Sequence, residues 1–190
     1  MFRMMISTLA LMFFVSLAQG QTLEERRILA EYTYANKLEI ITSGPGGWVT
    51  AKEEAQVKQE LSATRQSDFL YQESIVGANN LSNAAKGVAT NRDNQALGYA
   101  VSATDVIEEN QDFIDAIAVA ESELENVRYL LDLNTEQGLW EAELALLSTP
   151  LGDAMVIINN AYDDSILAWN MAKVKWSQAA ADWLQGLTYL

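Results

Sequence analysis

Apolar side chains recur at alternating spacings of four and three residues through the middle of the chain. This stripe comprises Tyr99, Ala103, Val106, Asn110, Phe113, Ile117, Ala120, Leu124, Val127 and Leu131. Such a repeat lines one face of an α-helix and is typical of coiled-coil seams. It predicts one helix over 82–132, with Asn110 as a polar seam residue that fixes register. A long helix of a globular bundle would show the same spacing.

The remaining segments also favour helices, because residues that break regular structure are scarce. Clear interruptions occur only around Pro45, which lies among glycines, and around Pro150. The sequence predicts helices over 22–43, 50–78, 82–132, 139–148 and 151–188. We therefore expect an all-α fold, an elongated bundle of about four long amphipathic helices with coiled-coil-like seams and one short helix. An unbroken 82–132 helix would span about 75 Å, so it either bends near Gly98 or makes the molecule elongated.

Three helix starts carry capping signals. Thr22 with Glu25 and Thr50 with Glu53 match the capping box. In this motif the side chain of each residue accepts a hydrogen bond from the backbone N–H of the other. Thr149 stands before a proline, which favours the first position of a helix. The sequence predicts that these three threonines begin helices.

Two further stripes lie outside the central helix. The predicted second helix has a weaker seam, interrupted by Thr64 and Asp68, whose apolar members are Val57, Leu61, Tyr71, Ile75 and Ala78. The last helix carries large side chains seven residues apart, namely Tyr162, Trp169, Trp176, Trp183 and Leu190. An aromatic stripe is compatible with a core. It is also compatible with an interaction face, because Trp and Tyr are frequent hot-spot residues. We predict an interaction face at Tyr162, Trp169, Trp176 and Trp183, while the sequence leaves open whether the partner helix belongs to the same chain.

The first twenty residues have the pattern of a secretory signal peptide. Arg3 precedes a long apolar run, and Ala18 and Gly20 supply small residues before the predicted cleavage site. The apolar run is shorter than the roughly 20 residues that span a bilayer, so we expect cleavage rather than a membrane anchor. The predicted organisation is a signal peptide over 1–20 and a single helical-bundle domain over 21–190, secreted and without stable membrane insertion.

Composition excludes several function classes. The chain has no cysteine and no histidine, and its net charge is −14. Zinc fingers, disulfide frameworks and thiol or imidazole catalysis are therefore excluded, and nucleic-acid binding is disfavoured because it requires clustered Lys and Arg. Adjacent carboxylates occur, but we find no phosphate-binding loop or nucleophile motif. We expect no enzymatic activity.

The negative charge is concentrated in one part of the chain. Residues 93–172 contain sixteen acidic side chains against Arg128 alone, whereas 21–92 contain nine acidic and eight basic side chains. A solvated surface that keeps the protein soluble explains this distribution. Weak binding of several calcium ions is a second interpretation, because hard cations prefer carboxylate oxygens. Neutralisation by calcium would then promote assembly.

One segment between predicted helices resembles an EF-hand loop. It offers oxygen donors at Asp132, Asn134, Glu136 and Glu143, at loop positions one, three, five and twelve. The turn glycine is displaced, because Gln137 occupies position six and Gly138 follows it. Calcium coordination and an ordinary helix connection are the two interpretations. A separate motif, Asn80-Leu81-Ser82, is an N-glycosylation sequon with Asn80 as the acceptor.

These features lead to two functional hypotheses. The first is a secreted, acidic, helical structural or matrix protein that self-associates or binds another helical protein through its seams, with modulation by calcium and no other cofactor. The second is a soluble extracellular carrier whose bundle opens around a lipid or another apolar ligand, an analogy of architecture with helical apolipoproteins only. Native mass with and without calcium distinguishes the two.

Overall fold

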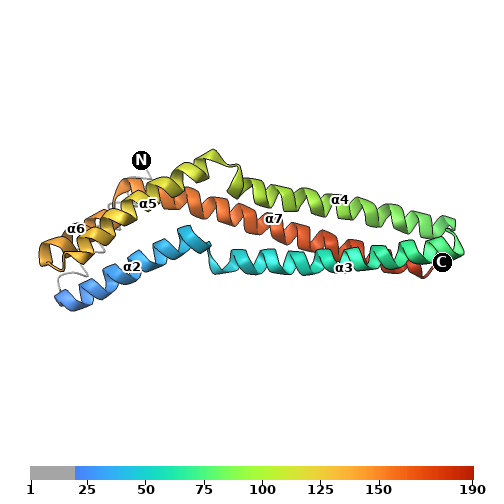
Figure 1. The fold of residues 1–190 in the computed structure, drawn as a ribbon, viewed down its shortest axis with the longest axis horizontal. Coiled ribbons are helices and arrows are strands. Elements are labelled where there is room, and N and C mark those ends of the chain that lie inside the picture. The colour runs from blue at the N-terminus through green and yellow to red at the C-terminus, as the bar shows by residue number, and fades with distance from the viewer. Residues whose placement is uncertain (1–19) are drawn as a thin grey trace. The chain divides into compact units, whose positions relative to one another are not determined.

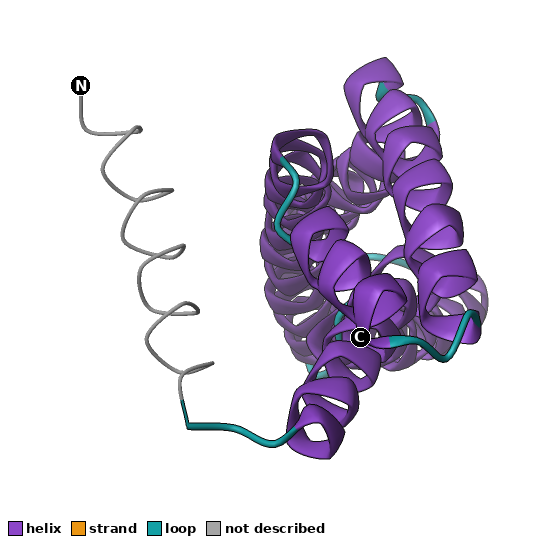
Figure 2. Ribbon diagram, turned by 90° about the vertical axis from the view of Figure 1, so that its left-hand side faces the viewer, coloured by secondary structure: helices purple, strands orange, loops and turns teal. Residues whose placement is uncertain are grey.

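The structure is a computed structural model that describes residues 20–190, and the predicted signal peptide lies outside this range apart from Gly20. Within the range there are six helices and no strand, joined by short loops (Figures 1 and 2). Their bounds are α2 Leu23–Ser43, α3 Gly46–Val76, α4 Asn80–Glu108, α5 Gln111–Asp132, α6 Glu136–Leu146 and α7 Thr149–Leu187. The predicted all-α bundle of long helices with one short helix is confirmed. None of the described helices is both long and apolar enough to cross a membrane.

The predicted 82–132 helix is wrong at one point, because the chain is interrupted at Glu109–Asn110 between α4 and α5. Asn110 is not a seam residue: its side-chain oxygen accepts hydrogen bonds from the backbone N–H groups of Asp112 (3.0 Å) and Phe113 (3.3 Å). It therefore caps the start of α5. Gly98, the expected bend, lies inside the continuous α4.

The helix starts agree only in part with the predicted caps. The capping box of Thr22 and Glu25 is confirmed by hydrogen bonds of 2.8 and 3.2 Å in the two directions. Thr50 lies inside α3, which already begins after Pro45. At α7 the hydroxyl of Ser148, rather than that of Thr149, accepts from the helix backbone. Both predicted caps were therefore placed after the actual helix start.

The described chain forms two compact units. Unit 1 comprises the chain up to Ser43 together with Asp115–Ile158, and unit 2 comprises Gly44–Ile114 together with Asn159–Leu190. In unit 1, α5 buries the seam that the sequence predicted, including Ala120, Leu124, Val127 and Leu131. The Arg26 guanidinium of α2 forms two hydrogen bonds with the carboxylate of Glu143 on α6, one of them 3.0 Å long. Unit 1 thus combines a small apolar core with a half-buried ion pair.

Unit 2 consists mainly of α3, α4 and the part of α7 from Asn159 onward. All three helices repeat their inward residues every seven positions. The inward residues of α7 are Tyr162, Trp169, Trp176 and Trp183, those of α4 are Ser82, Ala89, Ala96 and Ala103, and those of α3 are Trp48, Ala55, Ser62 and Phe69. Trp48 meets Tyr162 near the start of α3, whereas Phe69 meets Trp183 near its end. Hence α3 and α7 run parallel, with α4 antiparallel to both. A seven-residue repeat on each helix is the requirement for layered coiled-coil packing.

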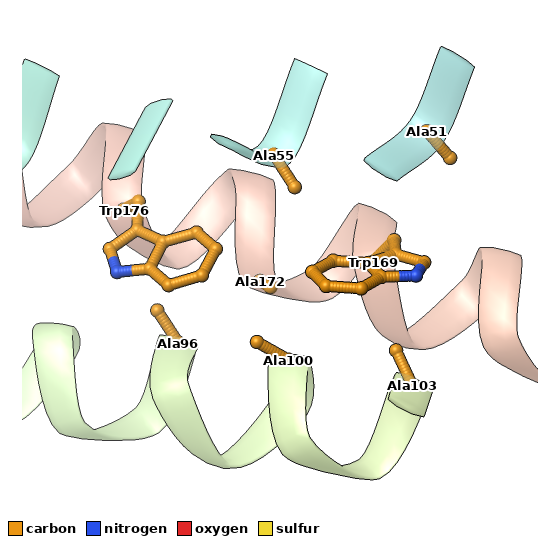
Figure 3. Packing of buried hydrophobic residues seen from close by; sticks show 8 residues of the cluster. All are labelled: Ala51, Ala55, Ala96, Ala100, Ala103, Trp169, Ala172 and Trp176. Atoms are coloured by element: carbon orange, nitrogen blue, oxygen red, sulfur yellow. The ribbon is translucent and has the colours of Figure 1, made fainter. Parts of the chain in front are cut away.

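Large rings from α7 occupy the space left by alanines on the other two helices. In Figure 3, Ala51 and Ala55 of α3 and Ala96, Ala100 and Ala103 of α4 point toward the rings of Trp169 and Trp176. Both rings are buried. Because a methyl group is small, the helices can approach closely around each indole without leaving a void. Such packing has the density typical of protein interiors.

A polar layer interrupts this core near its far end. The carboxylate of Asp93 on α4 accepts a hydrogen bond from the Ser62 hydroxyl of α3 (2.6 Å) and another from the indole N–H of Trp183 on α7 (2.8 Å). One side chain thereby links all three helices of unit 2. The buried N–H of Trp169, in contrast, has no acceptor among the described residues.

This difference between two tryptophans of one stripe predicts different costs of substitution by phenylalanine. Both changes remove similar apolar area, but Trp183→Phe also takes the indole donor from one oxygen of Asp93, which keeps only the Ser62 hydroxyl, whereas Trp169→Phe removes an unpaired buried donor. We expect Trp183→Phe to lower the free energy of unfolding by about 1–3 kcal/mol more than Trp169→Phe. Urea denaturation followed by circular dichroism measures both. Equal losses would show that the Asp93 layer contributes nothing.

Candidate interaction surfaces

The Trp stripe of α7 is buried inside unit 2. Exposed fractions are 6% for Tyr162, 7% for Trp169, 4% for Trp176 and 1% for Trp183. The helices that cover these rings, α3 and α4, belong to the same chain. The predicted interaction face is thus corrected to an internal packing face. The physical reason is the row of small side chains on α3 and α4, which admits the rings.

The seam predicted for the second helix lies on the opposite side of α3 from the residues that pack. Its apolar members are largely exposed: Val57 60%, Leu61 41%, Tyr71 64% and Ile75 60%. The inward side of α3 instead carries Ala51, Ala55, Ser62 and Phe69. We call the exposed positions Val57, Leu61, Thr64, Asp68, Tyr71 and Ile75 the outer α3 stripe. No described element of the chain covers it, although its spacing is that of a coiled-coil seam.

The two sides of α3 divide in this way because unit 2 takes its large side chains from α7. Trp169 and Trp176 fill the centre of the unit, so the facing positions of α3 must be small. The branched residues of α3 are then left for its other side. The prediction that α3 carries an apolar stripe is confirmed. The predicted stripe contains the larger residues, and these lie on the side of the helix that faces outward.

Charged residues flank the outer α3 stripe asymmetrically. Lys58 and Arg65 lie along one edge, and Glu53 and Glu60 lie along the other, as expected for the positions beside a coiled-coil seam. Arg65 also approaches the Asp68 carboxylate of its own helix at 3.6 Å. This surface therefore has an apolar centre and edges of opposite charge.

The EF-hand-like segment does not bring its four oxygen donors together in the described chain. Asp132 ends α5 and pairs with Arg128 at 2.8 Å, and Glu143 pairs with Arg26 of α2. The Arg26–Glu143 hydrogen bond raises the pKa of Arg26 above its ordinary value. Within residues 20–190, no three Asp or Glu side chains gather in a way that could hold a metal ion. Calcium binding at Asp132, Asn134, Glu136 and Glu143 stays a prediction.

The glycine of this segment has a packing role. A Cβ at Gly138 would lie 2.6 Å from the backbone oxygen of Leu130, so a larger residue would force α6 away from the end of α5. Thr135 caps α6 through its hydroxyl, which accepts from the Gly138 N–H at 3.0 Å. These contacts are those of a tight helix–helix connection.

The sequon asparagine is accessible. Asn80 is the exposed first residue of α4, and its neighbour Asn79 caps that helix by accepting from the backbone N–H groups of Leu81 and Ser82, both at 2.9 Å. The Ser82 hydroxyl is buried in the same cap. Glycosylation of Asn80 stays a prediction.

A shallow groove of about 550 Å³ runs along α4 in unit 2. Its lining mixes Ala84, Gly87 and Val88 with the polar residues Asn83, Asn91, Arg92, Gln95 and Lys175. Amides and cations suit a polar occupant rather than a lipid chain. The groove gives no specific support to an apolar ligand.

The aromatic cluster at the start of unit 2 contains the titratable group with the clearest pH consequence. The Tyr162 ring lies 6.0 Å from that of Trp48 and 5.4 Å from that of Phe113, between centroids. Gly44, at a φ of +73°, allows the chain to pass this ring, since a Cβ there would come within 3.0 Å of it. Burial raises the pKa of the Tyr162 hydroxyl above its ordinary value of 10.0.

The raised pKa of Tyr162 predicts a loss of stability at alkaline pH. Above about pH 10 the unfolded chain releases the tyrosine proton while the folded protein keeps it, so the free energy of unfolding falls as pH rises through the folded pKa. Tyr162→Phe keeps the ring and removes this loss. We expect the variant to lose less stability than the wild type between about pH 8 and 11. Urea titrations at both pH values measure the difference.

Lys37 in α2 has the opposite effect on stability. Burial lowers the pKa of its ammonium group, so its contribution to the free energy of unfolding rises with pH. Lys37 is present in the wild type and in the Tyr162→Phe variant, so the difference between their pH curves reports on Tyr162 alone. Parallel pH curves for the wild type and the variant would contradict the prediction.

Comparison of the chain with known protein families, with curated proteins and with solved structures gives no match. The Asp93 layer was not predicted from the sequence. Neither was the inward side of α4, which is marked by the repeat of Ser82, Ala89, Ala96 and Ala103 every seven residues. A heptad repeat of small residues indicates the inward side of a helix, just as a heptad repeat of large apolar residues does.

Proposed function

We propose that this protein is a secreted, acidic, helical structural protein that self-associates through apolar helix faces left uncovered by its own fold. The outer α3 stripe carries the proposal. Four large apolar side chains at coiled-coil spacing are exposed there, on a helix whose opposite side is already packed. Exposed apolar side chains bordered by polar and charged residues are typical of sites where proteins meet.

Secretion is part of the proposal and is supported by the sequence of residues 1–20, with its single arginine, apolar run and small residues before position 21. The absence of cysteine fits a protein that is held together by helix packing alone. Unit 2 supplies an example, since its core consists of aromatic rings, alanines and one polar layer.

Calcium is proposed as a modulator rather than as a bound structural ion. The sixteen acidic residues of 93–172 repel one another between copies at neutral pH. Many of their side chains are exposed, among them Glu108, Glu109, Asp112, Glu121 and Glu125. Weakly bound divalent cations would reduce this repulsion, and so would salt that screens it.

Sedimentation velocity of the chain from Gln21 onward tests self-association directly. We expect species larger than the monomer at high protein concentration, and a shift toward them in millimolar calcium that exceeds the shift in calcium-free buffer of equal ionic strength. Association that ignores calcium would remove calcium from the proposal. A monomer at every concentration, with and without calcium, would contradict self-association itself.

A charge in the outer α3 stripe tests whether association uses this face. Leu61→Glu places a carboxylate in the stripe, whereas Leu97→Glu makes the same change at an exposed leucine of α4 outside it; the exposed fractions are 41% for Leu61 and 54% for Leu97. We expect Leu61→Glu to raise the dissociation constant at least about tenfold and Leu97→Glu to leave it nearly unchanged, because a charge in a buried seam is not solvated. Equal effects of the two variants would assign association to another surface.

A further inference from the structure

We infer that two copies of this chain pair through α3 as an antiparallel coiled coil with a two-fold axis at Gln66. This inference rests on the proposed function and specifies its interface. The occupant of the outer α3 stripe is then the same stripe of a second copy. The order of residues along the stripe, their exposure and the charges beside it support this pairing.

The stripe has the same polarity pattern when it is read from either end. In order, it presents Val57, Leu61, Thr64, Asp68, Tyr71 and Ile75, that is, two apolar, two polar and two apolar positions. An isologous dimer requires such a self-complementary surface. Antiparallel pairing about Gln66 places Val57 opposite Ile75, Leu61 opposite Tyr71, and Thr64 opposite Asp68, and it repeats each pair across the axis.

Each layer of this arrangement is chemically matched. The outer layers bring branched or aromatic side chains together, all of them exposed in the single chain. The two central layers place the Thr64 hydroxyl next to the Asp68 carboxylate. In the single chain this hydroxyl donates to the Glu60 backbone oxygen at 2.9 Å, and in the pair it turns its proton to the carboxylate, a stronger acceptor. A polar pair in the centre of a seam is a known device for fixing the register and orientation of helices.

Other registers lose this match. A shift of one heptad in either direction moves Asp68 opposite Val57 or Tyr71, which leaves the carboxylate without its threonine partner. It also shortens the seam at one end. Buried carboxylates without a partner are strongly unfavourable. The position of Asp68 therefore selects the register centred on Gln66.

A parallel pair is disfavoured by the same residue. In that arrangement each position faces its own copy, so Asp68 faces Asp68 within the seam. The flanking charges would favour it, because Glu53 would approach Lys58, and Glu60 would approach Arg65, of the second copy. Those pairs are exposed and contribute little, whereas two carboxylates in one seam layer repel at low dielectric.

The antiparallel form brings the two Arg65 side chains close to each other, and the two Asp68 carboxylates balance their charge. Arg65 occupies the edge of the helix next to the Asp68 position, as their contact of 3.6 Å shows. When the second copy runs in the opposite direction, its Arg65 lies within about one residue of axial rise from the first copy's Asp68. Two arginines and two carboxylates then gather at the axis without net charge.

Disulfide trapping tests the polarity, and the absence of native cysteine makes it specific. Full-length secreted chains with Val57→Cys or Ile75→Cys are mixed in equal amounts under mild oxidation, and the linked peptides are identified by mass spectrometry. We expect the 57–75 disulfide to predominate. In the antiparallel pair two copies of residue 57 are about 27 Å apart along the axis, far beyond the reach of a disulfide.

Three other outcomes would overturn the inference. Predominant 57–57 and 75–75 disulfides would assign a parallel pair. Absence of any disulfide in a protein that sediments as a dimer would place the interface elsewhere and leave the proposed self-association intact. A monomer in sedimentation would contradict both the antiparallel pair and the proposed self-association. The experiment thus distinguishes a wrong helix orientation from a wrong proposed function. Circular dichroism of each cysteine variant confirms that the exposed substitutions leave the fold unchanged.

Discussion

The packing of large α7 rings against alanines of α3 and α4 is the interaction on which unit 2 depends. Trp169 and Trp176 are buried between Ala51 and Ala55 on one side and Ala96, Ala100 and Ala103 on the other (Figure 3). At this level α7 provides the two buried rings, the alanines of the other two helices make room for them, and Trp48 of α3 and Tyr99 of α4 pack at the edge. The distance between the helices is set by this asymmetry, because a larger residue at any of these alanines would collide with a ring.

The same asymmetry determines what the surface of unit 2 presents. Between Trp48 and Phe69 the inward side of α3 carries only small residues, Ala51, Ala55 and Ser62, and larger residues such as Leu61 and Tyr71 lie on the outside. A helix that packs with alanine inward and branched residues outward reverses the usual arrangement of an amphipathic helix. Such a surface is understandable if a second helix covers it, and this connects the internal packing to the proposed association. The core and the candidate interface are thus two consequences of one distribution of residue sizes.

Polar contacts add specificity to an otherwise apolar design. Asp93 joins Ser62 and Trp183, so it selects one rotation of three helices relative to one another. Ser165 has a similar role nearer the start of α3, since its hydroxyl accepts from the Trp48 indole at 2.7 Å and donates to the Ala103 carbonyl at 2.9 Å. Alanine-lined faces slide easily, because one methyl group resembles the next. Fixed hydrogen bonds within the layers counteract this sliding.

The sequence by itself determined the helical class, most helix bounds to within a few residues, the inward seam of α5 and the existence of stripes on α3 and α7. These features depend on periodicity, which is local. Only the tertiary structure decided which stripe is inside. The α7 rings are core because alanines of the same chain face them, whereas the outer α3 stripe is uncovered because those rings require small residues on its other side. It also decided that Asn110 caps α5 rather than joining a seam. Each of these outcomes depends on a neighbour distant in sequence, and periodicity along one helix contains no information about that neighbour.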